Sequence, residues 1–271
     1  MDGSNLEGAS FSASRSVEDR PLAFIGAMPS EIKTLEGQLA ERREETFEGW
    51  HFVVGKFAGK PAVVMRTGMG KVNAACGTTL LLEHYKPAAV IMVGIVGGID
   101  PSLGPGDVVI GATSTQWDYG SVSTSGSRVR GAVDPIHDHP DPVAFPADAK
   151  LLDLARQIKP DADFGLHFGV IATGDRFIAS ADKRQELQDT VHAASVDNES
   201  GAVAQVCWQQ EVPFIAVRGI SDSADAQAGS SIRENGARAT DHASWVTAHL
   251  AERYLSPEAI TEPLKSPHPG R

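Results

Sequence analysis

The chain has few of the features that mark secreted, membrane or nucleic-acid-binding proteins. Only two of its 271 residues, Cys76 and Cys207, are cysteines. Both lie in apolar helical patterns, so we expect buried, reduced thiols in a cytoplasmic protein. No stretch approaches the ~18 consecutive apolar residues of a membrane span. Basic residues are too few to balance the acidic ones, and the formal net charge of −11 argues against nucleic acid or an anionic membrane as a partner.

The two ends of the chain differ in composition from its middle. Residues 1–20 are rich in serine and charge and lack the apolar segment of a signal peptide, so they are predicted to form a disordered tail. Residues 256–271 are predicted to form a proline-rich tail. A hydrophobic content of 41% supports a packed core, and we expect residues 21–255 to form one domain.

Apolar runs and helical patterns alternate along this central region. Short apolar runs predict buried strands, and apolar residues at helical spacing predict the helices between most of them. Strands are expected at residues 22–27, 49–57, 60–66, 88–93, 108–112, 165–172 and 214–217, and helices at residues 29–39, 71–84, 151–158, 183–189, 199–210 and 238–254. This order predicts an α/β fold with a mostly parallel or mixed central sheet and helices on both faces.

Two carboxylates, Glu199 and Asp222, stand where apolar runs give way to polar residues. Glu199 begins a predicted helix, and Asp222 lies in the polar turn after the strand at 214–217. Ligands of open α/β sheets bind at such strand ends, so both are candidate site residues. Glu31 follows the first strand. Taken alone, it is better explained as a carboxylate that stabilises the start of a helix beginning near Pro29.

Other motifs give weaker signals. Gly68–Lys71 lacks the spacing of a Walker phosphate loop, so a tight turn is favoured over a ligand-binding backbone. The glycine-rich turn at 94–98 would let a ligand approach the main chain. Residues 114–146 lack periodicity, which predicts a functional flap or a disordered loop. Within it, His137 and His139 could bind metal, but spacing places no third ligand, so a solvated loop is favoured.

Four separated segments together resemble one family. They are IGAMPSE (25–31), TGMGKVNAA (67–75), GDRFI (174–178), and VDNESGAVAQV with ISDSAD (196–206 and 220–225). They resemble the nucleoside phosphorylase superfamily and, within it, the 5′-methylthioadenosine/S-adenosylhomocysteine nucleosidases. The resemblance covers residues 22–255. It implies hydrolysis of the N-glycosidic bond of a purine, adenine-type nucleoside, with 5′-substituted adenosines as the default substrates, by a homodimer without metal or organic cofactor.

The resemblance also assigns roles to individual positions. Glu31 matches the carboxylate that takes a proton from the attacking water, Glu199 the one that binds the ribose hydroxyls, and Asp222 the acid that protonates the purine at N7. Adenine leaves poorly unless it is protonated, and general-acid catalysis typically contributes ~10²–10⁴-fold. The other positions that match substrate contacts are Phe177, Ile178, Ile95, Gly97, Asn198 and Ser221.

The sequence departs from the family pattern at three places. Ile95 stands where the family usually has serine. Asn198 replaces an apolar methionine, which predicts additional polar recognition around the sugar. No phenylalanine follows Asp225, although the nucleosidases cover the 5′-alkylthio group with an aromatic residue of the partner subunit. These departures leave the 5′ substituent open.

Two other functions stay open as well. Phosphorylases of the superfamily hold phosphate with arginines at two positions that Glu31 and Met92 occupy in this chain. Water is therefore favoured as the nucleophile, although Arg66 or Arg218 could form a different phosphate site. The remaining alternative is an inactive nucleoside-binding protein, which the departures suggest and the retention of three carboxylates opposes.

Overall fold

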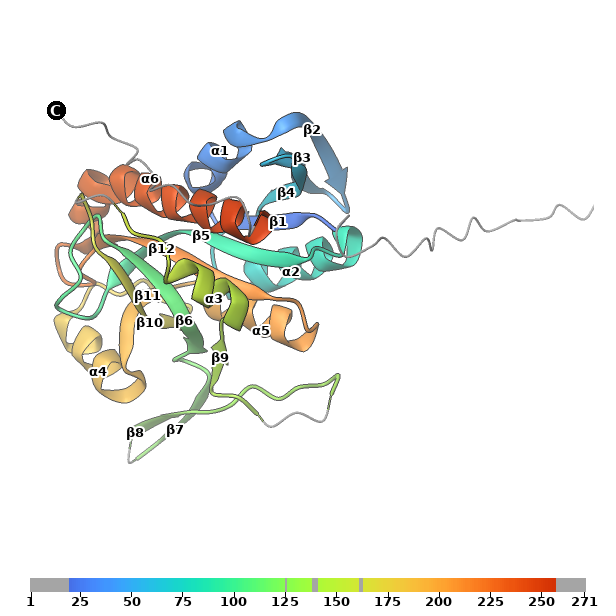
Figure 1. The fold of residues 1–271 in the computed structure, drawn as a ribbon. Helices are drawn as coiled ribbons and strands as arrows, with labels where there is room; N and C mark the ends of the chain where they lie inside the picture. The colour runs from blue at the N-terminus through green and yellow to red at the C-terminus, as the bar shows by residue number, and fades with distance from the viewer. Residues whose placement is uncertain (1–19, 125, 138–140, 161–162, 257–271) are drawn as a thin grey trace, which may run out of the picture.

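Strands and helices alternate through most of the chain, as the apolar pattern predicts (Figure 1). A computed structural model describes residues 20–124, 126–137, 141–160 and 163–256, so nearly all of the two predicted tails lies outside the described residues. The strands are β1 (Leu22–Gly26), β2 (Ala40–Phe47), β3 (Trp50–Phe57), β4 (Lys60–Arg66), β5 (Ala89–Gly98), β6 (Val108–Gln116), β7 (Gly120–Ser123), β8 (Gly126–Val129), β9 (Ala144–Pro146), β10 (Leu166–Thr173), β11 (Ala193–Asp197) and β12 (Phe214–Asp222). The helices are α1 (Pro29–Gln38), α2 (Lys71–Tyr85), α3 (Ala149–Ala155), α4 (Ala181–Val191), α5 (Ser200–Gln209) and α6 (Ala228–Leu255).

The main sheet is mixed and partly closed. Its strands run in the order β11-β10-β6-β12-β5-β1-β4-β3-β2, and β9 pairs with β6. β5 pairs in parallel with both β1 and β12, whereas β12 and β6 are antiparallel. β11 also pairs with the end of β5, which closes β11, β10, β6, β12 and β5 into a ring. The carboxyl ends of β1, β5 and β12 therefore meet at one edge of the sheet.

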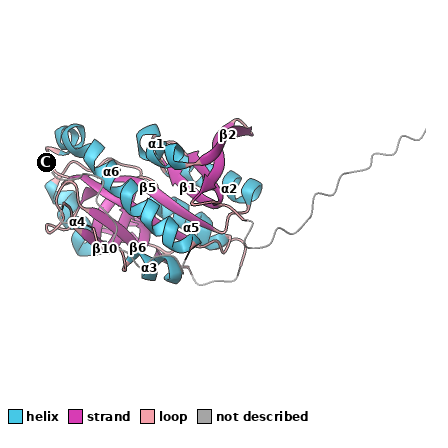
Figure 2. Cartoon of the chain, turned by 45° about the horizontal axis from the view of Figure 1, so that its top comes forward, coloured by secondary structure: helices cyan, strands magenta, loops and turns pink. Residues whose placement is uncertain are grey.

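Helices cover both faces of the sheet because its central strands are apolar on both sides (Figure 2). Leu22 and Phe24 of β1 belong to a core that includes residues of α1, α3 and α6. Ala23 and Ile25, which point the other way, belong to a core that includes residues of α2 and α5. Burying one large aliphatic side chain contributes about 1.5–3 kcal/mol. The predicted fold class is thus confirmed.

The structure is more regular than the sequence pattern predicted. β5 continues through the expected glycine-rich turn to Gly98, and β12 continues through the expected acidic turn to Asp222. The segment 114–146, predicted as a flap or a disordered loop, contains the end of β6, the β7–β8 hairpin and β9. β2 was missed because it is a charged, mostly exposed strand, as edge strands often are.

The surface of α2 also differs from expectation. Val72 is 81% exposed and Cys76 is exposed, so the prediction of two buried cysteines holds only for Cys207. Both thiols are free. The buried side of α2 instead includes Ala74 and Leu81. Among the described residues, no helix combines the length and apolarity needed to cross a membrane.

Candidate active site

The structure brings Glu31, Glu199 and Asp222 to the same edge of the sheet. Glu31 follows β1, Asp222 ends β12, and Glu199 lies between β11 and α5. All three side chains are buried, with 2%, 6% and 2% of their residues' surface exposed. Buried carboxylates require partners, and the partners of these three define the site.

Glu31 does more than stabilise the start of α1. Its Oε2 accepts hydrogen bonds from the backbone N–H groups of Ala27 (2.8 Å) and Met28 (2.7 Å), as expected for a carboxylate in the first turn of a helix. Its Oε1 accepts a third hydrogen bond from the N–H of Ile95 in β5 (2.9 Å). A carboxylate that only caps a helix does not need this third hydrogen bond. The bond to Ile95 fixes the carboxylate against the end of β5, next to the other site residues.

Glu199 is held by the loop before α2. Its Oε1 accepts a hydrogen bond from the N–H of Gly70 (2.8 Å), so the glycine string at 68–71 is more than a tight turn. Its Oε2 lies 3.6 Å from Nη2 of Arg218. Burial and the neighbouring Asp197 raise the pKa of Glu199 to about 7, although Arg218 and the Gly70 N–H favour the charged form.

A bulge in β12 orients Asp222. The register between β12 and β5 shifts between Ile220 and Asp222, so Ser221 is the extra residue, and such bulges re-aim a side chain. Oδ1 of Asp222 accepts a hydrogen bond from the N–H of Ala224 (2.8 Å). Burial raises the pKa of Asp222 above its ordinary value. The hydrogen bonds from Ser221 and from the N–H of Ala224 partly oppose this rise.

The Ser221 hydroxyl contacts both Asp222 and β5. Its Oγ lies 2.8 Å from Oδ2 of Asp222 and 3.2 Å from the carbonyl oxygen of Val96. A hydroxyl has one proton and can also accept. It can therefore donate to Val96 while it accepts a hydrogen bond from the protonated carboxyl group. The same hydroxyl lowers the pKa of Asp222 when it donates to the charged carboxylate, so Ser221 can hold either form of this side chain.

Arg218 connects the carboxylates and was named from sequence only as a possible phosphate ligand. It is completely buried in β12, with Nη2 2.7 Å from Oδ2 of Asp197 and Nη1 3.8 Å from Oε1 of Glu31. Together with its 3.6 Å approach to Glu199, it faces three carboxylates. The signal that could have placed it is a charge inside the apolar run 214–220.

Asp197 is the second site residue that sequence reasoning missed. It accepts hydrogen bonds from the hydroxyl groups of Thr173 and Ser200, each at 2.5 Å, in addition to its ion pair with Arg218. Its partners lie on β10, α5 and β12. It therefore anchors Arg218 through Nη2, the nitrogen that Glu199 also approaches.

Glycines of β5 make room for this network. A Cβ atom at Gly94 would lie 2.2 Å from both Nη1 of Arg218 and Oε1 of Glu31, and one at Gly97 would lie 3.1 Å from Oδ1 of Asp222. β5 thus passes Arg218 and Glu31 at Gly94 and Asp222 at Gly97. These positions lie about 10 Å apart along a strand, which is enough for a sugar and the base attached to it.

The remaining predicted residues lie around these groups. Phe177, 60% exposed, and Ile178, 7% exposed, form the turn after β10. The Asn198 amide donates a hydrogen bond to the carbonyl group of Gly174 in that turn, so polar recognition of the sugar by Asn198 stays a prediction. Ile95 contributes its backbone N–H to Glu31, not its side chain. Within the described ranges, no group of three or more His, Cys, Asp or Glu side chains could hold a metal ion, and of the pair His137 and His139 only His137 is described.

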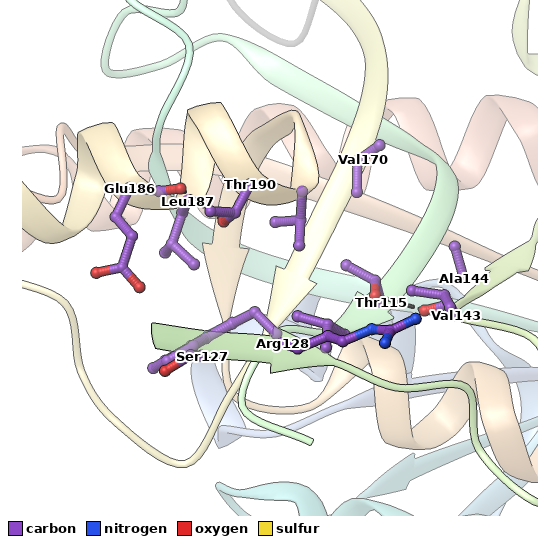
Figure 3. A pocket seen from close by; sticks show the side chains of 12 residues that line it. Thr115, Ser127, Arg128, Val143, Ala144, Val170, Glu186, Leu187 and Thr190 are labelled. Carbon is purple, nitrogen blue, oxygen red and sulfur yellow. Dashed lines mark hydrogen bonds between the residues drawn. The ribbon is translucent and has the colours of Figure 1, made fainter. Parts of the chain in front are cut away.

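Two cavities differ in their relation to the site. One of about 810 Å³ lies between the β1–α1 turn, the start of β3 and the β4–α2 loop, and Met28 and Met69 are among the residues that line it. It therefore adjoins the loops that hold Glu31 and Glu199. The other, of about 430 Å³, is lined by residues of β6, β8, β10 and α4, including Arg128 and Glu186 (Figure 3). None of the three site carboxylates lines this second cavity.

Comparison with known proteins agrees with this geometry. The family model of the phosphorylase superfamily matches residues 21–256. The chain belongs to the phosphorylase superfamily. The expected resemblance to the 5′-methylthioadenosine/S-adenosylhomocysteine nucleosidases within this superfamily is also confirmed. Such a nucleosidase from Bacillus thuringiensis (strain Al Hakam) is 36% identical over 221 residues, which cover 78% of this chain and 89% of the relative.

Solved structures of this superfamily share the fold. The Neisseria meningitidis nucleosidase in complex with methylthio-immucillin-A matches with a TM-score of 0.76 and 30% identity, over 86% of this chain and 99% of that one. The Colwellia psychrerythraea nucleosidase in complex with adenine matches with a TM-score of 0.76 and 26% identity, over 86% and 94% of the two chains. Both names describe what those proteins are and hold.

Proposed function

We propose that the chain hydrolyses the N-glycosidic bond of an adenine-type nucleoside, releasing the free base and a ribose moiety. The observation that carries this proposal is the convergence of Glu31, Glu199 and Asp222 at one edge of the sheet, all buried. N-glycosidic cleavage develops positive charge on the sugar and negative charge on the departing base. Two carboxylates beside the sugar would stabilise its positive charge, and one acid beside the base would neutralise the negative charge by protonation.

Asp222 is the proposed acid for the leaving base. Its pKa, which burial raises, supports a carboxyl group that keeps its proton until N7 of the purine approaches. As the bond between C1′ and N9 breaks, the proton passes from Asp222 to N7, and adenine leaves neutral. Phe177 and Ile178 lie on the turn that we propose contacts the base.

Glu31 is the proposed base for the attacking water. Backbone N–H groups hold both of its oxygens in place, so it needs no rearrangement to accept a proton. Water adds to C1′ on the face opposite to the base, and Glu31 takes the proton that the water loses. The logic is that of the carboxylate pairs of glycosidases.

Glu199 is the proposed ligand of the ribose hydroxyls. Its position is fixed by the Gly70 N–H and by Arg218. In its charged form it also stabilises the oxocarbenium-like sugar. Because its pKa lies at about 7, this contribution increases as the pH rises through neutrality.

Hydrolysis is favoured over phosphorolysis. Arg218 is saturated by carboxylates and has no exposed surface, so it cannot bind free phosphate. Met92 is likewise fully buried. An anion beside the charged form of Glu31 would be repelled. An inactive binding protein is disfavoured because the Ile95 backbone, and not a serine hydroxyl, supports Glu31.

We also propose that the chain forms a homodimer through the exposed side of α2. Met69 and Val72 are 67% and 81% exposed, and Cys76 follows Val72 by one helical turn. Exposed apolar side chains that gather at the start of a helix are typical of an interface. Met69 also lines the 810 Å³ cavity, so a second copy docked there would lie beside the site. The free thiols of Cys76 and Cys207 suit the cytoplasm, which we propose as the compartment.

A substrate panel tests the activity. The protein is incubated with adenosine, inosine, methylthioadenosine and S-adenosylhomocysteine, with and without inorganic phosphate, and free base is measured. Phosphate-independent release of adenine is the expected result. Strict dependence on phosphate would establish a phosphorylase instead, and no release from any nucleoside would establish a binding protein.

A further inference from the structure

Lys71 stands at an unfavourable place in a helix. It is the first residue of α2, where the helix dipole is positive and disfavours a cation. Its side chain is nevertheless only 16% exposed. Its Nζ lies 2.7 Å from Oδ1 of Asp118 and 3.2 Å from Oδ2 of Asp175. These two carboxylates offset the unfavourable position, and they follow β6 and β10, far from α2 in the sequence.

Asp118 extends this contact to the turn after β10, residues 174–178, which contacts the base in the proposed reaction. Its side chain is 19% exposed, and both of its oxygens are used. Oδ1 accepts a hydrogen bond from Nζ of Lys71 (2.7 Å), and Oδ2 accepts one from the backbone N–H of Asp175 (2.7 Å). Hydrogen bonds to an ionised group are short and strong. Asp118 therefore joins the start of α2 firmly to this turn.

Asn198 fastens the first residue of the same turn. Its amide donates a hydrogen bond to the carbonyl oxygen of Gly174, and the N–H of Gly174 donates one to the carbonyl oxygen of Asp197 (3.0 Å). Gly174 has no room for a side chain, because a Cβ atom there would lie 2.3 Å from Nε1 of Trp117. The turn therefore begins at a residue that is bound directly to the segment leading into Glu199.

These contacts form a closed ring that joins two parts of the site. Oε1 of Glu199 accepts a hydrogen bond from the N–H of Gly70 (2.8 Å), the residue before Lys71. The ring runs in the order Glu199, Gly70, Lys71, Asp118, Asp175, Gly174 and Asn198, and the last of these adjoins the first. It contains both the proposed ligand of the ribose and the start of the turn that contacts the base. Each of these parts is thus held from two directions.

We propose that Lys71 and Asn198 are positioning residues that hold the turn at residues 174–178 at a fixed spacing from Glu199 before the substrate binds. The inference rests on the proposed nucleosidase function and adds to it how the base and ribose sites are kept in place. Asn198 acts through Gly174 in this role and not on the sugar. Preorganised groups lower the barrier to reaction, and a misplacement of about 1 Å costs about 10²-fold in rate.

The test cuts the ring at two places. In Lys71→Met and in Asn198→Leu, kcat/KM for methylthioadenosine should fall about tenfold. In the double variant the loss should exceed the product of the two single losses, because one cut leaves the ring connected through its other links. Lys71→Arg keeps a cation beside Asp118 and should restore most of the activity. Lys86→Met is the matched control, because it breaks an exposed pair with Glu83 at the other end of α2, and it should leave kcat/KM unchanged.

A pH profile separates positioning from a purely structural role. The pKa of Glu199 is about 7, and the N–H of Gly70 favours its charged form. When Lys71→Met loosens Gly70, the acid limb of kcat/KM against pH should move to higher pH. The other charged groups that face Glu199 are the same in both proteins, and they are Asp197, Arg218 and Glu31. A loss of stability alone would leave the position of this limb unchanged.

The outcomes that overturn the proposal differ from one another. Unchanged kcat/KM in both single variants, or a double variant that loses only the product of the single losses, would overturn the ring and leave the nucleosidase function intact. A smaller loss in Asn198→Leu for 2′-deoxyadenosine or 3′-deoxyadenosine than for adenosine would show that Asn198 recognises a ribose hydroxyl instead. Absence of cleavage of every nucleoside by the unmodified protein would overturn the function and the positioning role together.

Discussion

Nη2 of Arg218 lies 2.7 Å from Oδ2 of Asp197, and the two side chains are 0% and 2% exposed. The pair connects β12 with the end of β11. The same guanidinium group lies 3.8 Å from Glu31 and 3.6 Å from Glu199. One cation therefore faces three carboxylates that arrive from separate parts of the sequence, and the geometry of the candidate site depends on it.

Replacing Arg218 by methionine should destabilise the fold as well as stop activity. The substitution leaves Asp197, Glu31 and Glu199 buried without their cation, and breaking a buried ion pair costs about 3–5 kcal/mol. Urea unfolding measures the free energy of unfolding of the variant. Lys56→Met, which breaks the exposed pair of Lys56 with Glu41, should cost less than about 1 kcal/mol. Similar losses for the two variants would contradict the proposed importance of Arg218.

Replacing Asp222 by asparagine should slow the release of adenine by about 10²–10⁴-fold, because an amide cannot deliver the proton to N7. The loss should appear in kcat more than in KM. A riboside whose leaving group needs no proton, such as p-nitrophenyl riboside, should be cleaved by the variant at nearly the rate of the unmodified protein. Equal losses for both substrates would show that Asp222 acts on something other than the leaving group.

Glu199 should make stability depend on pH in a defined window. Burial and Asp197 raise its pKa to about 7 in the folded protein, against an ordinary value of 4.5. The folded state therefore binds this proton more tightly than the unfolded state does. Its contribution to stability is complete below pH 4.5 and is lost as the pH rises through 7.

The comparison of the unmodified protein with Glu199→Gln isolates this contribution, because other titrating groups are common to both. Urea unfolding at intervals between pH 4.5 and pH 8 should show a difference in the free energy of unfolding that shifts in favour of the variant as the pH rises. A difference that is constant across this range would mean that Glu199 titrates alike in the folded and unfolded states.

Replacing Val72 by aspartate should convert the proposed dimer into a monomer. A charge at a position that is 81% exposed in one copy is harmless to the fold, but it would be desolvated against a second copy. Sedimentation velocity at micromolar concentration measures the change in mass. Thr34→Asp, at an exposed position of α1, should remain a dimer. A monomeric unmodified protein would end the dimer proposal.

The sequence predicted the elements whose evidence is local. Apolar runs located the central strands because strands buried on both faces must be apolar throughout. The motifs around Glu31, Glu199 and Asp222 located three carboxylates that the structure brings together. The exact ends of β5 and β12 were not predictable, because the glycines and acidic residues that suggest turns are here required by the site.

The missed features depend on contacts between distant residues. Nothing near Arg218 in the sequence indicates that Asp197, 21 residues earlier, is its partner. Likewise, the apolar helical pattern around Cys76 predicted a buried thiol that is in fact exposed. Such a pattern does not reveal whether a helix face packs inside its own chain or remains at the surface.

The hydrogen bonds of Glu31 have a consequence for how this chain could change over time. The same carboxylate closes the first turn of α1 and is the proposed base for the attacking water. A mutation that removes the carboxylate would therefore disturb local folding as well as chemistry. A descendant that kept the fold for binding alone would more readily lose activity through Asp222, whose removal leaves the start of α1 intact. Activity would thus be lost first at Asp222, the proposed acid for the leaving purine, and not at Glu31, the proposed base for the attacking water.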